Sequence, residues 1–273
     1  MHINTMRNLH TIKYCDNKEA FYVPLKYGEE LIELGDRFPD YINKESIENV
    51  EIHLTSSGYC EIPKDVCEMK KLSTIYIPTL KCLNNFTAPA SLKFIQAYGE
   101  DNILTESTYL PSIEKIILPY FQDSNLSMRH FPNIKALRIG IDKSNSLMNR
   151  LSEFDFLEEL EVYPVKEGNF FEFIKDTNIS SLYIIGGKRK KLINFSSVIF
   201  EKLTTLRMGE FIFNDLDFLQ YFHNLNNVCI EKCEILGGIS RINSIEILFK
   251  NTKIGNVLYE NEIGLGNIYL TKD

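Results

Sequence analysis

The feature that most constrains the fold of this chain is a short repeat of three apolar residues. In each copy, one apolar residue is followed by two spacers, a second apolar residue, one spacer and a third apolar residue. Successive copies begin 17 to 25 residues apart. A period of this size indicates a stacked solenoid, in which each unit packs only against its neighbours. The copies begin at Ile47, Leu72, Leu92, Ile113, Ile134, Leu157, Ile179, Leu203, Leu225, Ile242 and Leu265.

The spacing within each triplet predicts a strand. The second and third apolar residues are two apart, so in an extended chain both side chains point to the same face. The residues between triplets must then carry the chain back so that the next strand lies parallel to the last. Aromatic residues three or four apart in these return segments, such as Phe170 and Phe173 or Phe218 and Phe222, predict short helical or 3-10 turns.

With these features the chain resembles the leucine-rich repeat proteins over about residues 45–273. The stretch Glu61–Ile77 is most similar to a standard unit. Family units place Asn or Cys three residues after the triplet, where its side chain bonds backbone groups at the turn. Cys233 holds that place here, but Thr55, Leu80, Asp142 and Phe211 hold it in other units. The resemblance implies an irregular, bacterial-type α/β solenoid. We expect a leucine-rich repeat horseshoe with a long parallel sheet on its concave face and short helical, 3-10 or loop return segments.

Two regions are predicted along the chain. Residues 1–46 are expected to form an N-terminal capping segment, and residues 47–273 an array of about eleven units. Within the first region, residues 28–41 predict a short amphipathic turn, and Leu9-Ile12-Tyr14 is a weaker echo of the triplet. The spacing of 17 residues between Leu225 and Ile242 is the expected irregularity of the array.

The C-terminal end of the array is expected to be an open edge. The last predicted strand ends at Leu270, three residues before the end of the sequence. Only Lys272 and Asp273 would then guard the edge. Self-association through this C-terminal edge strand is therefore an alternative to a monomer.

The composition restricts the partner and the compartment. A net charge of −7 argues against nucleic acid or an anionic membrane as the main partner. The sequence has no run of 18 apolar residues, and its first 20 residues lack the apolar core of a signal peptide. We therefore expect a cytoplasmic protein, or a secreted one if a leader has been removed. Abundant Asn, Ile and Lys and the absence of Trp indicate an AT-rich bacterial genome, and the six cysteines are expected to be free, mostly buried thiols.

The candidate binding surface consists of the strand residues that alternate with the buried ones. On the predicted concave face, Tyr and Phe occur among Arg and Glu, a mixture that protein interfaces favour. The alternative interpretation is that Tyr is simply a good strand residue. The predicted partner-binding residues are Tyr76, Phe94, Tyr98, Arg138, Glu161, Tyr163, Tyr183 and Arg207.

Other chemistries have weaker support. Cys229 and Cys233, near His223, suggest a metal site, but their positions in the unit diverge. Gly186-Gly187-Lys188 lacks the upstream glycine of a phosphate-binding loop. The basic run over residues 188–191 is interpreted as a solvated loop. No catalytic triad is legible among the five histidines. We expect no enzymatic activity, no cofactor and no metal.

The sequence therefore predicts a non-enzymatic protein–protein interaction scaffold that binds a protein partner on its concave sheet. Two alternatives stay open. One is an immunity or antitoxin-type protein that neutralises a toxin, which similarity to small repeat-type immunity proteins would imply. The other is a secreted, adhesin-like host-interaction factor, which would share the fold.

Overall fold

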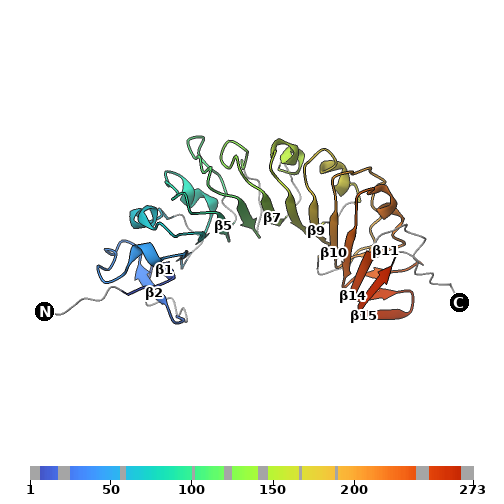
Figure 1. Ribbon diagram of the computed structural model, residues 1–273, viewed down its shortest axis with the longest axis horizontal. Coiled ribbons are helices and arrows are strands. Elements are labelled where there is room, and N and C mark those ends of the chain that lie inside the picture. Colours follow the sequence, from blue (N-terminus) through green and yellow to red (C-terminus); the bar gives the residue numbers. More distant parts are fainter. Residues whose placement is uncertain are drawn as a thin grey trace. The chain divides into compact units, whose positions relative to one another are not determined.

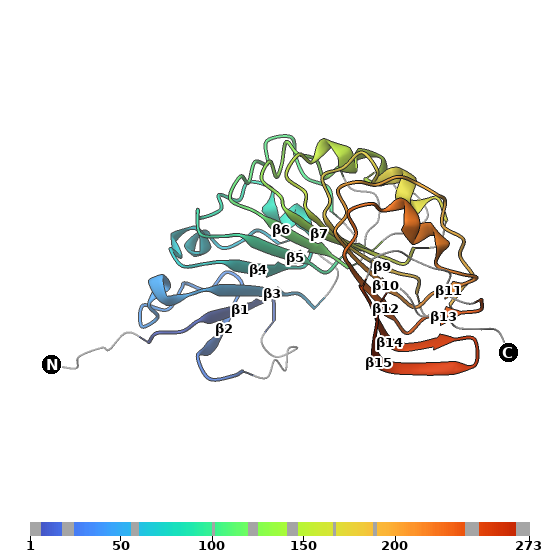
Figure 2. The same ribbon diagram turned by 45° about the vertical axis from the view of Figure 1, so that its right-hand side comes forward.

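The computed structural model describes residues 7–17, 25–55, 60–99, 102–119, 125–140, 147–165, 168–187, 190–237 and 246–265. The chain divides into two compact units, unit 1 (residues 1–135) and unit 2 (residues 136–273). Each unit is a stack of short parallel strands joined by return segments (Figures 1 and 2). None of the described helices is long and apolar enough to cross a membrane.

In the described part of unit 1, six parallel strands lie in the order β2-β1-β3-β4-β5-β6. The strands are β1 (Thr11–Cys15), β2 (Glu29–Glu33), β3 (Asn49–His53), β4 (Thr74–Ile77), β5 (Phe94–Ala97) and β6 (Lys115–Leu118). The 3-10 helices in its return segments are η1 (Lys44–Ser46), η2 (Lys64–Glu68) and η3 (Leu80–Leu83). Figure 2 shows β3, β4, β5 and β6 side by side.

The amphipathic turn that the sequence predicted over residues 28–41 is wrong, because part of this segment is a strand. Glu29–Glu33 form β2, which pairs with β1 because backbone pairing across the sheet overrides the local pattern. The chain enters the sheet with β1, adds β2 at the edge and returns to the other side of β1 with β3. Ile12 and Tyr14 are buried in register with the triplet of β3. Two strands therefore precede residue 46, and the capping role of residues 1–46 stays a prediction.

Six strands of unit 2 pair in parallel in the order β7-β8-β9-β10-β12-β14. They are β7 (Ala136–Gly140), β8 (Glu159–Tyr163), β9 (Ser181–Ile185), β10 (Thr205–Gly209), β12 (Asn227–Glu231) and β14 (Glu246–Ile254). The second half of β14 also pairs with β13 (Glu234–Ile235), which pairs with β11 (Ile212–Phe213). The described 3-10 helices of this unit are η4 (Met148–Glu153), η5 (Phe170–Phe173) and η6 (Asp217–Tyr221). The expected 3-10 turns are thus found in the return segments of both units.

The C-terminal end of the described chain is a β-hairpin. β14 turns back at Gly255-Asn256 into β15 (Val257–Leu265), which is antiparallel to it. The return segment expected after Ile247 is therefore wrong. A two-residue connection with Gly255 at φ 55° is typical of a tight hairpin, and Gly-Asn between two strands is the signal that the triplet interpretation overlooked. The parallel strand expected at residues 268–270 lies outside the described residues. Lys272 and Asp273 also lie outside them, and self-association through this edge stays a prediction.

The triplet that begins at Ile242 was expected to place Ile245 and Ile247 against the core, but the core-facing pair lies two residues later. Ile242 and Ile245 themselves lie outside the described residues. β14 pairs Val228 with Ile247 and Ile230 with Phe249, so Ile247 and Phe249 are the two apolar residues that face the core. Corresponding residues of β12 and β14 are thus 19 apart, and the expected irregularity in spacing is smaller than the sequence indicated.

The core follows the triplets closely. All members of the nine triplets that begin between Ile47 and Leu225 are buried, with exposed fractions of 5% or less. Behind the strands of unit 2, phenylalanines of the return segments pack against one another, with the Phe171 and Phe195 ring centroids 4.7 Å apart and those of Phe171 and Phe222 4.9 Å apart. This packing identifies Phe171, Phe195 and Phe222 as core residues. The described units are therefore a leucine-rich-repeat-like solenoid.

Two buried polar side chains, each three residues after the second inward-facing residue of β12 or β14, satisfy backbone groups. The buried Cys233 thiol accepts a hydrogen bond from the Phe211 N–H at 3.4 Å and donates to the Glu231 carbonyl at 3.2 Å. One unit later, the buried Thr252 hydroxyl accepts from the Cys233 N–H at 3.4 Å and donates to the Ile230 carbonyl at 2.9 Å. Burial raises the pKa of Cys233 to about 11, so its thiol stays protonated at neutral pH. The role that the resemblance implied for Cys233 is confirmed, and Thr252 extends it.

We predict that Leu206→Ala lowers the free energy of unfolding by about 2–5 kcal/mol, because Leu206 is fully buried and its truncation leaves a cavity. The matched change Thr205→Ala, one residue away on the opposite face of β10, should cost less than about 1 kcal/mol. Urea denaturation followed by circular dichroism measures both values. Equal losses would contradict the alternation of buried and outward residues in β10.

Candidate protein-binding surface

We call the face that carries the outward strand residues the open face. In unit 2, the register places outward residues of neighbouring strands directly beside one another. Arg138 of β7 pairs with Glu161 of β8, Glu161 with Tyr183 of β9, and Tyr183 with Arg207 of β10. These four residues form one row across four strands, which spans about 14 Å at 4.8 Å per strand.

The first half of this row is an arginine held between a carboxylate and a ring. Arg138 Nε lies 3.1 Å from Glu161 Oε1. The Arg138 guanidinium carbon lies 5.6 Å from the ring centroid of Tyr163, at the end of β8. A cation over an aromatic face is attracted by the ring quadrupole. The structure therefore brings Arg138, Glu161 and Tyr163 together, as the sequence predicted for residues of one surface.

The second half brings the same three residue types together, with Tyr183 on the strand before Arg207 and Glu231 on the strand after it. The Arg207 guanidinium carbon lies 4.4 Å from the centroid of Tyr183, and Arg207 Nε donates to Glu231 Oε2 at 3.2 Å. This hydrogen bond lowers the pKa of Glu231 and raises that of Arg207, since each charge stabilises the other. Burial raises the pKa of Tyr183, against the opposing effect of Arg207. Gly209 adds no side chain beside the ring; a Cβ there would lie 3.6 Å from the Tyr183 hydroxyl.

Exposure shows which end of each ion pair faces the solvent. The Arg138 and Arg207 side chains are each 43% exposed, whereas Glu161 is 23% and Glu231 19% exposed. The carboxylates are therefore less exposed to solvent than the guanidinium groups with which they pair. A planar guanidinium fixed in this way loses little further freedom when it binds a partner.

Unit 1 carries a separate aromatic group on its open face. Tyr76 of β4 meets Phe94 of β5 edge to face at 6.0 Å and stacks with Tyr98 at 6.4 Å between centroids. Lys115 Nζ of β6 lies 5.9 Å from the centroid of Phe94. Tyr98 is 45% exposed, and partial burial raises the pKa of its hydroxyl. Tyr76, Phe94 and Tyr98 thus lie together as the sequence predicted, in a different unit from the other five candidates.

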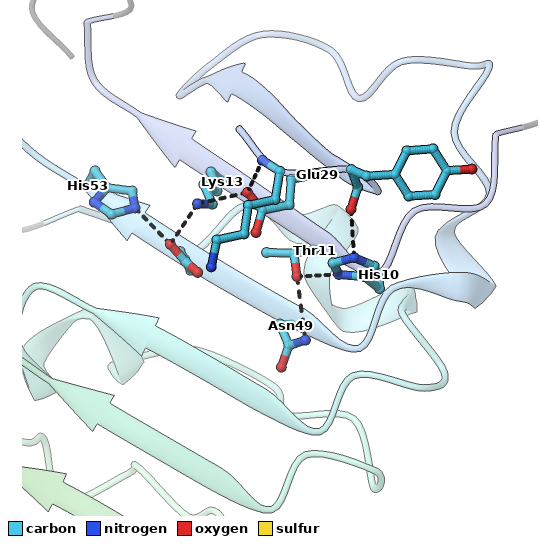
Figure 3. A network of polar contacts seen from close by, with 9 residues as sticks. His10, Thr11, Lys13, Glu29, Asn49 and His53 are labelled. Atoms are coloured by element: carbon cyan, nitrogen blue, oxygen red, sulfur yellow. Dashed lines mark hydrogen bonds and ion pairs between the residues drawn. The ribbon is translucent and has the colours of Figure 1, made fainter. Parts of the chain in front are cut away.

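Sequence reasoning missed a charged network on the open face of β1 (Figure 3). Lys13 Nζ lies 3.0 Å from Glu29 of β2 and 3.6 Å from Glu51 of β3, and His53 Nε2 lies 3.1 Å from Glu51. The Lys13 and Glu29 side chains are only 9% and 7% exposed. Burial raises the pKa of Glu29, but hydrogen bonds from the Lys26 N–H and from Lys13 outweigh it, so the pKa is lowered overall.

A signal for part of this network was present in the sequence. The triplet echo that ends at Tyr14 places Lys13 at the same outward position as Glu51, and the structure pairs these two residues in adjacent strands. Glu29 could not be found in this way, because β2 carries no triplet. Figure 3 also shows His10, Thr11 and Asn49 beside the network; the Thr11 hydroxyl lies 2.9 Å from His10 Nδ1 and 3.4 Å from Asn49 Nδ2.

The remaining candidate residues are dispersed. Cys229 is half-buried on the open face, whereas Cys233 is buried in the turn, so the two thiols diverge as expected. Buried His130 lies 3.1 Å from the hydroxyl of Ser127, within its own turn. Of the basic run, Lys188 and Arg189 lie outside the described residues.

Comparisons with known proteins find similarity among solved structures. A scan against protein-family models and a search of curated proteins yield no match. Among solved structures, a chain in the crystal structure of a TLR13–ssRNA13 complex is similar, with 13% sequence identity and a TM-score of 0.34. The match covers 77% of this chain and 43% of the other, so this protein spans less than half of that chain's length.

We predict that Lys13→Met lowers the free energy of unfolding by about 3–5 kcal/mol, because Glu29 is then left as a buried charge without its ammonium partner. The matched change Lys93→Met removes an ion pair with Glu114 whose partners are 50% and 35% exposed. It should cost no more than about 1 kcal/mol. Urea denaturation of both variants checks this, and a similar small loss in both would contradict a buried role for Lys13.

We also predict a pH dependence for Glu231. Its folded-state pKa lies below its unfolded value of about 4.3, so the Arg207 pair stabilises the fold at higher pH and this contribution disappears as the pH falls through the folded pKa. Glu231→Gln should therefore cost up to about 1 kcal/mol at pH 7 and almost nothing near pH 3. Urea denaturation at the two pH values measures the difference, and a cost independent of pH would exclude the ion pair as its source.

Proposed function

We propose that the protein is a non-catalytic interaction scaffold and that the open face of unit 2 binds another protein. The observation that carries this proposal is the repeated arrangement of an arginine placed over a tyrosine and held by a glutamate. Arg and Tyr are, with Trp, the residue types enriched in the energetic centres of interfaces. Here two such pairs are ordered before a partner arrives, which reduces the entropy lost on binding.

The chemistry of the row favours a protein over other partners. Arg138, Glu161, Arg207 and Glu231 alternate in sign, so the face offers both donors and acceptors rather than a basic stripe. With a net charge of −7, the chain as a whole would repel nucleic acid and anionic lipid. A mixed polar and aromatic protein surface complements this face best.

The aromatic group of Tyr76, Phe94 and Tyr98 is proposed as a second contact surface within unit 1. Its rings are half-buried or exposed and are fixed by mutual packing. Substitutions in this aromatic group test the second surface independently of unit 2. A partner that contacts only one of the two surfaces is insensitive to substitutions in the other.

The experiment is a pull-down from native lysate, followed by calorimetry with the purified captured protein. The test variant carries Arg138→Glu, Tyr163→Ala and Tyr183→Ala. The control variant carries Phe156→Ala, Phe173→Ala and Lys175→Glu, which make similar changes to exposed residues of the unit 2 return segments. A separate variant with Phe94→Ala and Tyr98→Ala probes unit 1.

We expect the test variant to weaken binding at least 100-fold, since central interface residues each contribute about 2 kcal/mol or more. The control variant should bind as the wild type does, and circular dichroism should show all variants folded. Equal binding by the test variant and the wild type would overturn the role of this face. The captured partner also decides between the finer hypotheses: a toxin would support the immunity-type interpretation and a host surface protein the adhesin-like one.

A further inference from the structure

Two cysteine thiols from consecutive repeats of unit 1 lie against each other. Cys60 follows β3, and Cys82 lies in η3 after β4. Their Sγ atoms are 3.7 Å apart. A disulfide needs about 2.05 Å between the sulfur atoms, so a small movement of the two side chains would suffice.

The two thiols differ in access. Cys82 is 1% exposed, whereas Cys60 is half-buried and reaches the solvent. The Thr79 hydroxyl also contacts Cys82 Sγ at 3.8 Å. An external reagent would therefore meet Cys60 first and Cys82 only through Cys60.

The electrostatics of the pair favour exchange. Hydrogen bonding from the Cys60 thiol lowers the pKa of Cys82, against the opposing effect of burial, with further help from Thr79. The same hydrogen bond and burial raise the pKa of Cys60. The hydrogen bond thus favours the thiolate on Cys82 over that on Cys60, so Cys82 can accept the proton that Cys60 loses when its sulfur attacks a disulfide.

We propose that Cys60 and Cys82 form a reversible disulfide by exchange with a small-molecule disulfide of the glutathione type. Nothing in this step depends on the proposed binding function. Cys60 is the attacking residue and Cys82 the resolving residue.

The reaction balances in two exchanges. As the Cys60 sulfur attacks one sulfur of the small disulfide, its proton passes to the Cys82 thiolate, the small S–S bond breaks and one small thiolate leaves. Cys82 then gives this proton to the departing thiolate. The Cys82 thiolate attacks Cys60 Sγ and releases the second small thiolate. The second small thiolate takes up a proton from water. Two protein thiols are oxidised, and one small disulfide is reduced to two thiols.

The bond would tie Cys60, which follows β3, to η3 and close a loop of one repeat. A covalent link of this kind restricts the unfolded chain, so oxidation should stabilise unit 1. Redox conditions would then set how easily β4, which lies between the two cysteines in the sequence, opens.

The test treats the full chain with oxidised glutathione at neutral pH and maps disulfides by mass spectrometry after alkylation of free thiols. We expect a Cys60–Cys82 bond with the loss of two hydrogens, its reversal by reduced glutathione, and a higher thermal midpoint for the oxidised protein. Cys67→Ser, which removes an exposed thiol, is the matched control and should react as the wild type does.

The Cys82→Ser variant separates the roles of the two residues. It should stop at a mixed disulfide between Cys60 and glutathione, whereas Cys60→Ser should leave Cys82 unmodified in the folded state, which circular dichroism verifies. The proposal is overturned if the wild type forms no Cys60–Cys82 bond while folded. It is also overturned if this pair oxidises no faster than the same cysteines in urea, because the folded geometry then contributes nothing.

Discussion

The rest of the structure depends on the burial of two apolar side chains per strand against the neighbouring repeat. Ile75 and Ile77, or Leu206 and Met208, have no core of their own and are covered only because the adjacent strands stand in register. Each such residue contributes roughly 1.5–3 kcal/mol relative to an exposed state. Register is therefore fixed, since a slip by one residue would turn these apolar side chains to the solvent.

Fixed register also determines the open face. Because the inward residues align from strand to strand, the outward residues between them align as well, and Arg207 lies beside Tyr183 without any loop to place it. Side chains on paired strands keep their positions better than side chains on loops. The Arg138–Tyr163 and Arg207–Tyr183 pairs are thus ordered by the same backbone pairing that forms the core.

Much of this arrangement was predictable because it follows from a single pattern. The triplets located nine strands and their buried residues. The spacer between the second and third apolar residues of each triplet located Arg138, Glu161, Tyr183 and Arg207 on one face. Which outward residues bond to one another was not predictable in the same way, since rotamers and side-chain length decide that Arg207 reaches Glu231.

Other elements could not be found from the triplet because other forces form them. β2 carries no triplet and exists through its pairing with β1, which also brings Glu29 to Lys13. The β14–β15 hairpin depends on the turn at Gly255-Asn256. The core-facing pair of β14 is Ile247 and Phe249, two residues later than the triplet indicated. The contact between Cys60 and Cys82 joins two return segments, where the spacing of the strands gives no guidance.

The most direct test of the central claim is hydroxyl-radical footprinting of the free protein and of its complex with the captured partner. Binding through the open face of unit 2 predicts that Tyr163 and Tyr183 lose reactivity in the complex. Exposed Phe156 and Phe173 in the return segments should react as before. Protection of Phe156 and Phe173 with unchanged reactivity of the two tyrosines would contradict the account and move the binding site to the return segments.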